Sequence, residues 1–159
     1  MRLQNLKQIK KMIVNVKADI KRIFKLGKKY QWQKPARCHH CKEPTIWGHG
    51  FVLSFFDGFN QGLYLKRYRC PYCHTVFKLK PFGYFNRFQA DIKLIFSSVL
   101  SRIYKGRYLS GLSWSRQHFW FIALKRNIEA YLSNTWNKGC IAGFRELISK
   151  GRIPVTSSI

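Results

Sequence analysis

The sequence has few acidic residues: it contains 6 Asp and Glu against 30 Lys and Arg, which gives a net charge of +24 at pH 7. A nuclease site needs several carboxylates on one sheet to hold two metal ions. No strand-rich segment follows the helical C-terminal part of this chain to carry such a site. A glycine-rich phosphate loop is also missing, because residues 48–50 lack the further glycines and the lysine of that motif. We therefore expect a protein that is not an enzyme.

Long uncharged runs are missing too. The longest stretch without Asp, Glu, Lys or Arg is 44–56, which is too short for a membrane span. Residues 1–16 leave no apolar stretch for a secretory signal. We therefore expect a cytoplasmic protein with reduced thiols and no membrane partner. The basic residues that break the N-terminal stretch are Arg2, Lys7, Lys10 and Lys11.

The surplus of positive charge has to be neutralised by an anionic partner or by counterions, because so many like charges repel each other in a compact chain. Disorder could also accompany such a charge, but 46% of the residues are hydrophobic and 16% are aromatic, which favours a packed core. Nucleic acid is the partner that this composition favours. We expect no small-molecule substrate.

Cysteine is scarce but patterned, since four of the 5 cysteines form two Cys-x-x-Cys pairs, Cys38/Cys41 and Cys70/Cys73. Two such pairs supply the four thiolates that Zn²⁺ binds in a tetrahedron. A disulfide framework would need an oxidising compartment, and a thioredoxin-like pair would need a βαβ pattern that is not evident. We predict one structural Zn²⁺, and we interpret Cys140 as a small apolar core residue.

Four of the histidines lie in or near the cysteine pairs and could replace a thiolate. We expect none of them to be a ligand. His74 follows Cys73, where metal-binding loops often turn through positive φ, a conformation that histidine tolerates better than most residues. The four are His39, His40, His49 and His74.

Residues 1–34 have an apolar stripe at steps of three and four, which predicts a basic amphipathic helix followed by a linker. The stripe could be covered by the rest of the protein, by a second copy in a homodimeric coiled coil, by a partner protein or by an anionic membrane surface. A helix formed only on nucleic acid is a further alternative. The stripe residues are Leu6, Ile9, Ile13, Val16, Ile20 and Ile23.

Residues 35–82 predict a small antiparallel zinc ribbon with strands at 45–54, 63–69 and 76–79. In the middle strand Tyr64, Lys66 and Tyr68 share one face. Such a face could stack on bases while its cation holds phosphates, or it could be core with a solvated rim.

Residues 83–150 predict helices, and 151–159 predict a flexible tail. One helix covers 92–104 with Asp91 near its start, and a second begins at Ser113, a plausible N-cap. A third short helix covers 141–149. The glycine-bearing turn before Ser113 suggests a helix-turn-helix, although any small helical bundle gives a similar pattern.

Residues 38–41 (CHHC), 67–77 (RYRCPYCHTVF) and 79–81 (LKP) resemble the zinc ribbon that opens many insertion-sequence transposases and transposase-associated proteins. In that family a helix-turn-helix follows, and residues 111–117 (GLSWSRQ) are similar to its recognition-helix entry. The resemblance spans about 37–132. It implies DNA binding at element ends or at a promoter, in a prokaryotic nucleoid.

The sequence therefore predicts an α+β, zinc-dependent, non-catalytic DNA-binding protein of mobile-element type, either transposase-associated or a transcriptional regulator. An RNA-binding or ribosome-associated protein is the main alternative, and an interaction adaptor using the N-terminal helix is the second. The residues expected to contact nucleic acid are Lys66, Arg67, Arg69, Lys78, Lys80, Arg87, Ser115, Arg116, Gln117, His118, Lys125 and Arg126.

Overall fold

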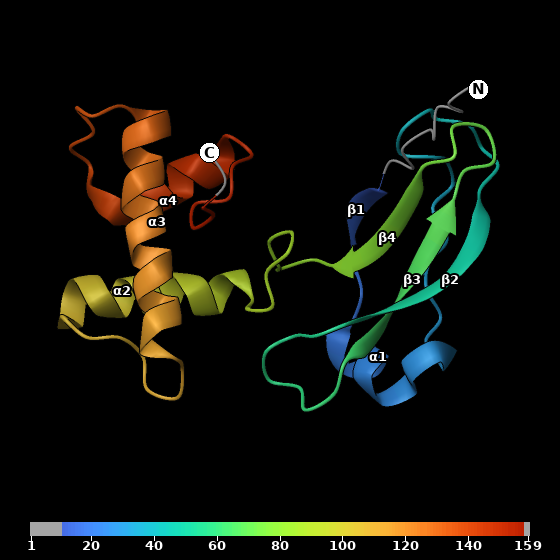
Figure 1. Cartoon of the computed structure of the whole chain (residues 1–159), viewed down its shortest axis with the longest axis horizontal. Coiled ribbons are helices and arrows are strands. Elements are labelled where there is room, and N and C mark those ends of the chain that lie inside the picture. The colour runs from blue at the N-terminus through green and yellow to red at the C-terminus, as the bar shows by residue number, and fades with distance from the viewer. Residues whose placement is uncertain (1–10, 158–159) are drawn as a thin grey trace, which may run out of the picture. The chain divides into compact units, whose positions relative to one another are not determined.

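The computed structural model describes residues 11–157, which form a four-stranded sheet and four α-helices (Figure 1). The predicted α+β class is confirmed. Two compact units divide the chain, one ending at Gln89 and the other beginning at Ala90. The first contains β1 (Lys11–Val16), α1 (Ile20–Leu26), a 3-10 helix (Gly27–Lys29), β2 (Trp47–Ser54), β3 (Leu63–Arg69) and β4 (Val76–Pro81), and the second contains α2 (Ile92–Lys105), α3 (Trp114–Leu132) and α4 (Gly139–Ser149).

The sheet of the first unit has the strand order β1-β4-β3-β2 (Figure 1). β3 pairs antiparallel with both β2 and β4, and its bounds are those predicted. β2 begins slightly later than expected and β4 extends to Pro81. β1 pairs with β4 in the parallel direction, so segments 1–34 and 35–82, predicted as separate, contribute to one sheet.

β1 overturns the predicted N-terminal helix over the described residues. Met12, Val14 and Val16 pack against the core, while Lys11 and Asn15 are exposed. This alternation has the period of two that a strand requires, and β-branched residues favour it. The open edge of β4 supplies the pairing partner. Leu6 and Ile9, the first residues of the predicted stripe, lie outside the described residues.

Within residues 11–34, the described part of the predicted segment, the short helix α1 is the α-helix that forms. Asp19 caps it, because its carboxylate accepts hydrogen bonds from the backbone N–H groups of Lys21 (2.9 Å) and Arg22 (3.2 Å). Ile23 is fully buried, in a cluster with Phe56 and Leu65. The end of the predicted stripe therefore packs inside its own unit.

The two faces of the sheet are covered by different apolar clusters. Tyr68, Phe77 and Leu79 pack with Cys38 and Ile46 on one face, and the rings of Tyr68 and Phe77 are stacked with centroids 5.9 Å apart. Leu63 and Leu65 of β3 belong to the cluster around Ile23 and Phe56. Tyr68 is thus part of the core, which was the alternative to base stacking for this face of β3.

The helices of the second unit follow the sequence signals closely. Asp91 caps α2 by accepting a hydrogen bond of 2.6 Å from the Leu94 N–H, and Ser113 caps α3 through the Arg116 N–H. Apolar residues of the three helices are buried together. The connection between α2 and α3 runs from Gly106 to Ser113, which is longer than the three- or four-residue turn of a helix-turn-helix.

The C-terminal segment differs from the predicted flexible tail. Val155 is fully buried. The Asn127 side-chain amide of α3 donates hydrogen bonds to the carbonyl oxygens of Pro154 (2.8 Å) and Thr156 (3.0 Å). These contacts hold the segment against α3 up to Thr156. Within residues 11–157 no helix is both long and apolar enough to cross a membrane.

Candidate metal centre and basic surfaces

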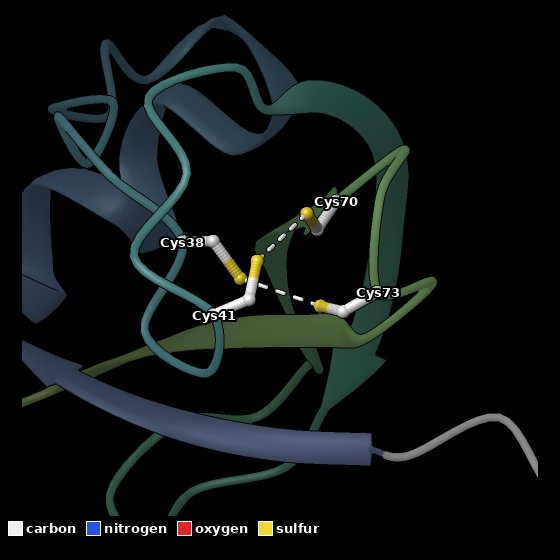
Figure 2. A group of neighbouring side chains, drawn as sticks. All are labelled: Cys38, Cys41, Cys70 and Cys73. Carbon is white, nitrogen blue, oxygen red and sulfur yellow. Dashed lines mark hydrogen bonds between the residues drawn. The ribbon is translucent and has the colours of Figure 1, made fainter.

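Two loops of the first unit bring four cysteine side chains together (Figure 2). The first cysteine loop, 38–43, precedes β2, and the second, 70–75, connects β3 to β4. The sulfur atoms of Cys38, Cys41, Cys70 and Cys73 all lie within 4.8 Å of one another. The sequence prediction that these two pairs meet is confirmed, and the group could hold a metal ion.

The two cysteine loops have matching backbone geometry. The Cys38 N–H donates to the Glu43 carbonyl oxygen (2.8 Å), and the Cys70 N–H donates to the Thr75 carbonyl oxygen (3.0 Å). His74 has a φ of 57°, which confirms the predicted positive φ. Each loop is therefore closed by the same backbone hydrogen bond, and this closure aims both of its sulfurs at one point (Figure 2).

The sulfur spacing fits a tetrahedral ion. Cys38 Sγ lies 3.7 Å from Cys73 Sγ, and Cys41 Sγ lies 3.5 Å from Cys70 Sγ. A tetrahedron with metal–sulfur bonds of about 2.3 Å has edges of ~3.8 Å. A disulfide would need about 2.05 Å, and all four cysteines are free. The donor set is made of soft sulfur ligands, which zinc and similar ions accept.

The pKa values of the Cys41 and Cys73 thiols are shifted in opposite directions. Burial raises the pKa of Cys73, but hydrogen bonds from the Thr75 side chain and backbone outweigh it and lower this pKa to about 5. The Glu43 backbone lowers the pKa of Cys41, whereas burial and the neighbouring cysteine sulfurs raise it, to about 12. An ion bound by all four sulfurs requires every thiol to lose its proton, so its affinity falls as the pH falls.

Thr75 supports the cysteine group and was not singled out by the sequence prediction. Its side chain is buried, and a hydrogen bond of 3.2 Å joins its Oγ1 to Cys73 Sγ. Such contacts orient and tune metal-ligating side chains. The signal that could have found it is its place two residues after the last cysteine of the motif.

Three side chains that could have been further ligands have other contacts, whereas the His40 backbone N–H donates to Cys38 Sγ (3.4 Å). The His39 ring contacts the Phe77 ring edge-on, with centroids 5.7 Å apart. His74 Nδ1 lies 3.4 Å from the Arg69 guanidinium. Cys140 belongs to α4, in the second unit, where burial raises the pKa of its half-buried thiol and Lys125 opposes this rise.

Basic residues flank both cysteine loops. Arg37 immediately precedes Cys38, and Arg69 immediately precedes Cys70. Lys42 and His74 follow the second cysteine of each loop, and both side chains are exposed. An ion held by the loops would therefore fix the positive charges of Arg37, Lys42 and Arg69 close to it.

The predicted contact residues on the sheet differ in accessibility. Lys66 is half-buried, with its Nζ 4.5 Å from the centre of the Phe51 ring and 5.8 Å from that of Tyr68. Arg67 and Lys78 are half-buried and lie directly opposite each other on β3 and β4. Arg87 is exposed.

The prediction that Lys80 contacts nucleic acid at the surface is wrong, because this residue is buried. Its side chain is 4% exposed. Its ammonium group donates hydrogen bonds to the carbonyl oxygens of Phe85 (2.7 Å) and Phe88 (3.1 Å). Burial, and to a smaller extent the charge of Lys78, lower its pKa to about 8. Its first role is to hold the turn after β4.

The predicted contact residues of α3 include a second correction. Gln117 is 1% exposed. Its side-chain oxygen accepts hydrogen bonds from Ser98 Oγ (2.7 Å) and from the Leu109 N–H (2.9 Å), and its side-chain nitrogen donates one to the Leu109 carbonyl oxygen (2.9 Å). A side chain so engaged holds the α2–α3 connection and is not available to a base. Ser115, Lys125 and Arg126 are exposed, as a contact role requires.

Arg116 and His118 lie among aromatic rings of the second unit. The Arg116 guanidinium lies 4.9 Å from the centre of the Trp120 ring. The His118 ring is stacked on Trp114, with centroids 4.6 Å apart and 11° between the planes, and its Nδ1 is 3.1 Å from the Tyr108 hydroxyl. Trp114 is 63% exposed, so one aromatic surface beside His118 remains open to solvent.

Comparison with protein-family models, with curated proteins and with solved structures gives no match to this chain.

Proposed function

We propose that the protein is a zinc-dependent, non-catalytic DNA-binding protein of mobile-element type, either transposase-associated or a transcriptional regulator. The observation that carries the proposal is the arrangement of the cysteine loops. Four sulfurs lie at tetrahedral spacing, and each cysteine pair is bracketed by basic residues, Arg37 and Lys42 in one loop and Arg69 and His74 in the other.

Zinc is the ion that this donor set fits best. Four thiolates fill a tetrahedral site and leave no position for water, so the ion would have a structural role. The first unit would then fold as a ribbon of β2, β3 and β4 around the ion, with β1 added at the edge. Binding of a structural zinc is coupled to folding and contributes an apparent ~10–16 kcal/mol, so chelation should unfold this unit.

The charge of the chain supports a nucleic-acid partner. If each of the 6 acids neutralised one of the 30 cations, 24 cations would still need counterions. A polyanion that replaces those counterions gains free energy from their release. We therefore propose a nucleoid location for the protein in the cell.

DNA is favoured within this proposal by the exposed polar positions of α3. Ser115, Lys125 and Arg126 are exposed on a single helix, whose first turn and polar surface could meet a duplex groove. The two buried residues, Gln117 and Lys80, are removed from the proposed contact set.

RNA is the second candidate, because several large aromatic side chains are exposed: Trp47 is 59%, Trp114 is 63% and Tyr104 is 75% exposed. Exposed rings of this kind stack on unpaired bases. A homodimer or partner complex through an N-terminal helix has less support, because Ile13 and Val16 belong to β1.

A competition titration separates the two candidates. The zinc-loaded full chain is bound to a labelled DNA duplex at fixed moderate salt and then titrated with unlabelled duplex or with a structured RNA of equal length. The proposal expects the duplex to compete at lower concentration. Stronger competition by RNA would replace DNA with RNA as the partner, and no binding to either would end the proposal.

A further inference from the structure

A pocket of about 270 Å³ opens on the face of the sheet that lies away from the cysteines. Phe77 and Leu79 of β4 pack into the core beside the cysteines. Successive side chains of a strand point to opposite faces, so Lys78 and Lys80 belong to the other face, and both line the pocket. All residues that line this pocket belong to the first unit.

Three cationic side chains are among the described residues that line this pocket. Lys78, Lys80 and Arg87 line it, and none of the other lining residues is Asp or Glu. Arg67 lies directly opposite Lys78 on the neighbouring strand, and its buried Nε has no hydrogen-bond partner. Like charges directly opposite each other destabilise a sheet. An anion bound beside them would convert this repulsion into attraction.

Hydrogen bonds from the Lys80 side chain hold the turn that carries Arg87. Lys80 donates hydrogen bonds to the carbonyl oxygens of Phe85 and Phe88, and the Phe88 N–H donates to the Phe85 carbonyl oxygen (3.1 Å). Lys80 Nζ also lies 5.7 Å from the ring centre of Phe56 and 5.8 Å from that of Tyr84, so this buried ammonium group supports the pocket from inside the protein.

The backbone of Arg87 is itself unusual. Its φ is 68°, a left-handed conformation that residues other than glycine seldom adopt. Strained residues of this kind cluster at binding sites, where the surrounding structure holds them. The sequence could have used glycine here at no conformational cost, and it places an arginine at the rim of a cationic pocket.

The remaining walls are apolar and aromatic. Phe55 is 58% exposed and Phe88 is half-buried, and both line the pocket together with Ile13 and Leu65. The volume of about 270 Å³ lies just below the range of small-molecule sites, which is about 300–1,000 Å³. A ligand of this site therefore combines one anionic group with one flat apolar ring of modest size.

We propose that this pocket binds a single nucleotide unit, with its phosphate on Lys78 and Arg87 and its base against Phe55 and Phe88. The unit could come from a single-stranded segment of the nucleic acid that the protein binds, and in this form the inference rests on the proposed function. A free mononucleotide presents the same chemistry.

The test uses the zinc-loaded full chain and two variants that remove a cation from the pocket. Arg87→Gly deletes the side chain while keeping a residue that accepts the positive φ, and Lys78→Gln keeps the length of the side chain. Lys21→Gln, on the exposed surface of α1, is the control for loss of one charge. A melting curve of each variant checks that the fold is retained.

Calorimetric titrations with AMP, with adenosine and with a short thymidine oligomer give the readout. We expect adenosine, which lacks the phosphate, to bind at least about tenfold more weakly than AMP, because it loses charge-assisted hydrogen bonds. We expect Arg87→Gly to weaken the binding of AMP or of the oligomer by about tenfold or more. Lys21→Gln should weaken the binding of either ligand by less than about twofold. If Arg87→Gly weakens only the binding of the oligomer, the natural ligand is a unit of a single strand. If it weakens only the binding of AMP, the natural ligand is a free nucleotide.

The inference is overturned if adenosine binds as well as AMP, or if Arg87→Gly and Lys78→Gln change neither ligand more than Lys21→Gln does. A duplex titration on the same samples keeps the two proposals apart. Duplex binding without any pocket effect would leave the proposed function standing and remove the nucleotide site. Nucleotide binding without duplex binding would have the opposite consequence.

Discussion

Lys42 and His74 occupy equivalent positions of the two cysteine loops and share a left-handed backbone, with φ of 67° and 57°. Each follows the second cysteine of its pair, at the point where the chain reverses. The same backbone hydrogen bond closes both loops, from Cys38 to Glu43 and from Cys70 to Thr75. The candidate metal centre is thus built from one local conformation used twice.

The left-handed conformation at His74 gives a prediction for stability. His74→Val should destabilise the zinc-loaded protein by about 1–2 kcal/mol, because a β-branched residue is strained at this φ. His74→Gly should be neutral or stabilising by up to about 1 kcal/mol, since glycine has no such strain. Urea unfolding curves measure both. His39→Val, at a residue outside the set with positive φ, is the control, and equal stability of the two valine variants would argue against the assigned strain.

Gln117 gives a second prediction, which separates a structural role from a role in base recognition. Gln117→Leu should lower the free energy of unfolding by about 1–3 kcal/mol, because it leaves the Leu109 backbone groups without partners. Ser115→Ala, at an exposed neighbour, should stay within about 0.5 kcal/mol of the wild type. A Gln117→Leu protein that melts normally but changes its sequence preference would restore the contact role.

Lys80 links stability to alkaline pH. Its pKa falls from 10.5 to about 8 on folding, so between these values the unfolded chain binds more protons than the folded chain. Stability contributed through this group must therefore rise with pH from about 8 to about 10.5. The Lys80→Met variant should lack this rise, so the difference in unfolding free energy between wild type and variant should grow over this pH range. The variant should also cost stability because the Phe85 and Phe88 carbonyl groups lose their donor.

The measurement for Lys80 is a series of urea unfolding curves across this pH range for both proteins. A difference in unfolding free energy that stays constant across the range would show that Lys80 keeps an ordinary pKa in the folded state. Lys21→Met, at an exposed residue of α1 in the same unit, controls for the loss of one cation.

Salt dependence tests the phosphate contacts. If ~8 cations contact DNA phosphates, log K should fall against log salt with a slope of about −7. Lys66→Ala should weaken all sequences alike and reduce the slope by about 1, whereas Arg116→Ala should relax sequence preference. Titrations of specific and random duplexes at several salt concentrations measure both effects. Equal losses on the two duplexes from both variants would contradict the separate roles.

Local signals explain what the sequence predicted well. The spacing of the cysteine pairs identified the candidate metal centre, and Asp91 and Ser113 marked the starts of α2 and α3. The positive φ of His74 was predicted from its place after Cys73. Each of these features depends on residues a few positions apart, which a single sequence displays directly.

The failures depend on tertiary partners that the local sequence pattern does not identify. The spacing of Ile13, Val16 and Ile20 fits a helix, but β1 is selected by the open edge of β4, which the N-terminal pattern cannot reveal. Lys80 and Gln117 carry polar groups that usually face solvent, and only the tertiary structure supplies the partners that bury them. The sequence pattern therefore predicted the cysteine loops correctly. It did not show that the side chains of Lys80 and Gln117 are buried and so unavailable to nucleic acid.

The most direct test of the account is native mass spectrometry of the full chain purified without chelator. We expect the mass of one chain plus one zinc ion, with the ion lost in Cys70→Ser and retained in Cys140→Ser. A chain that carries no metal, or a Cys70→Ser protein that keeps its zinc, would contradict the claim that these four sulfurs hold a single structural ion.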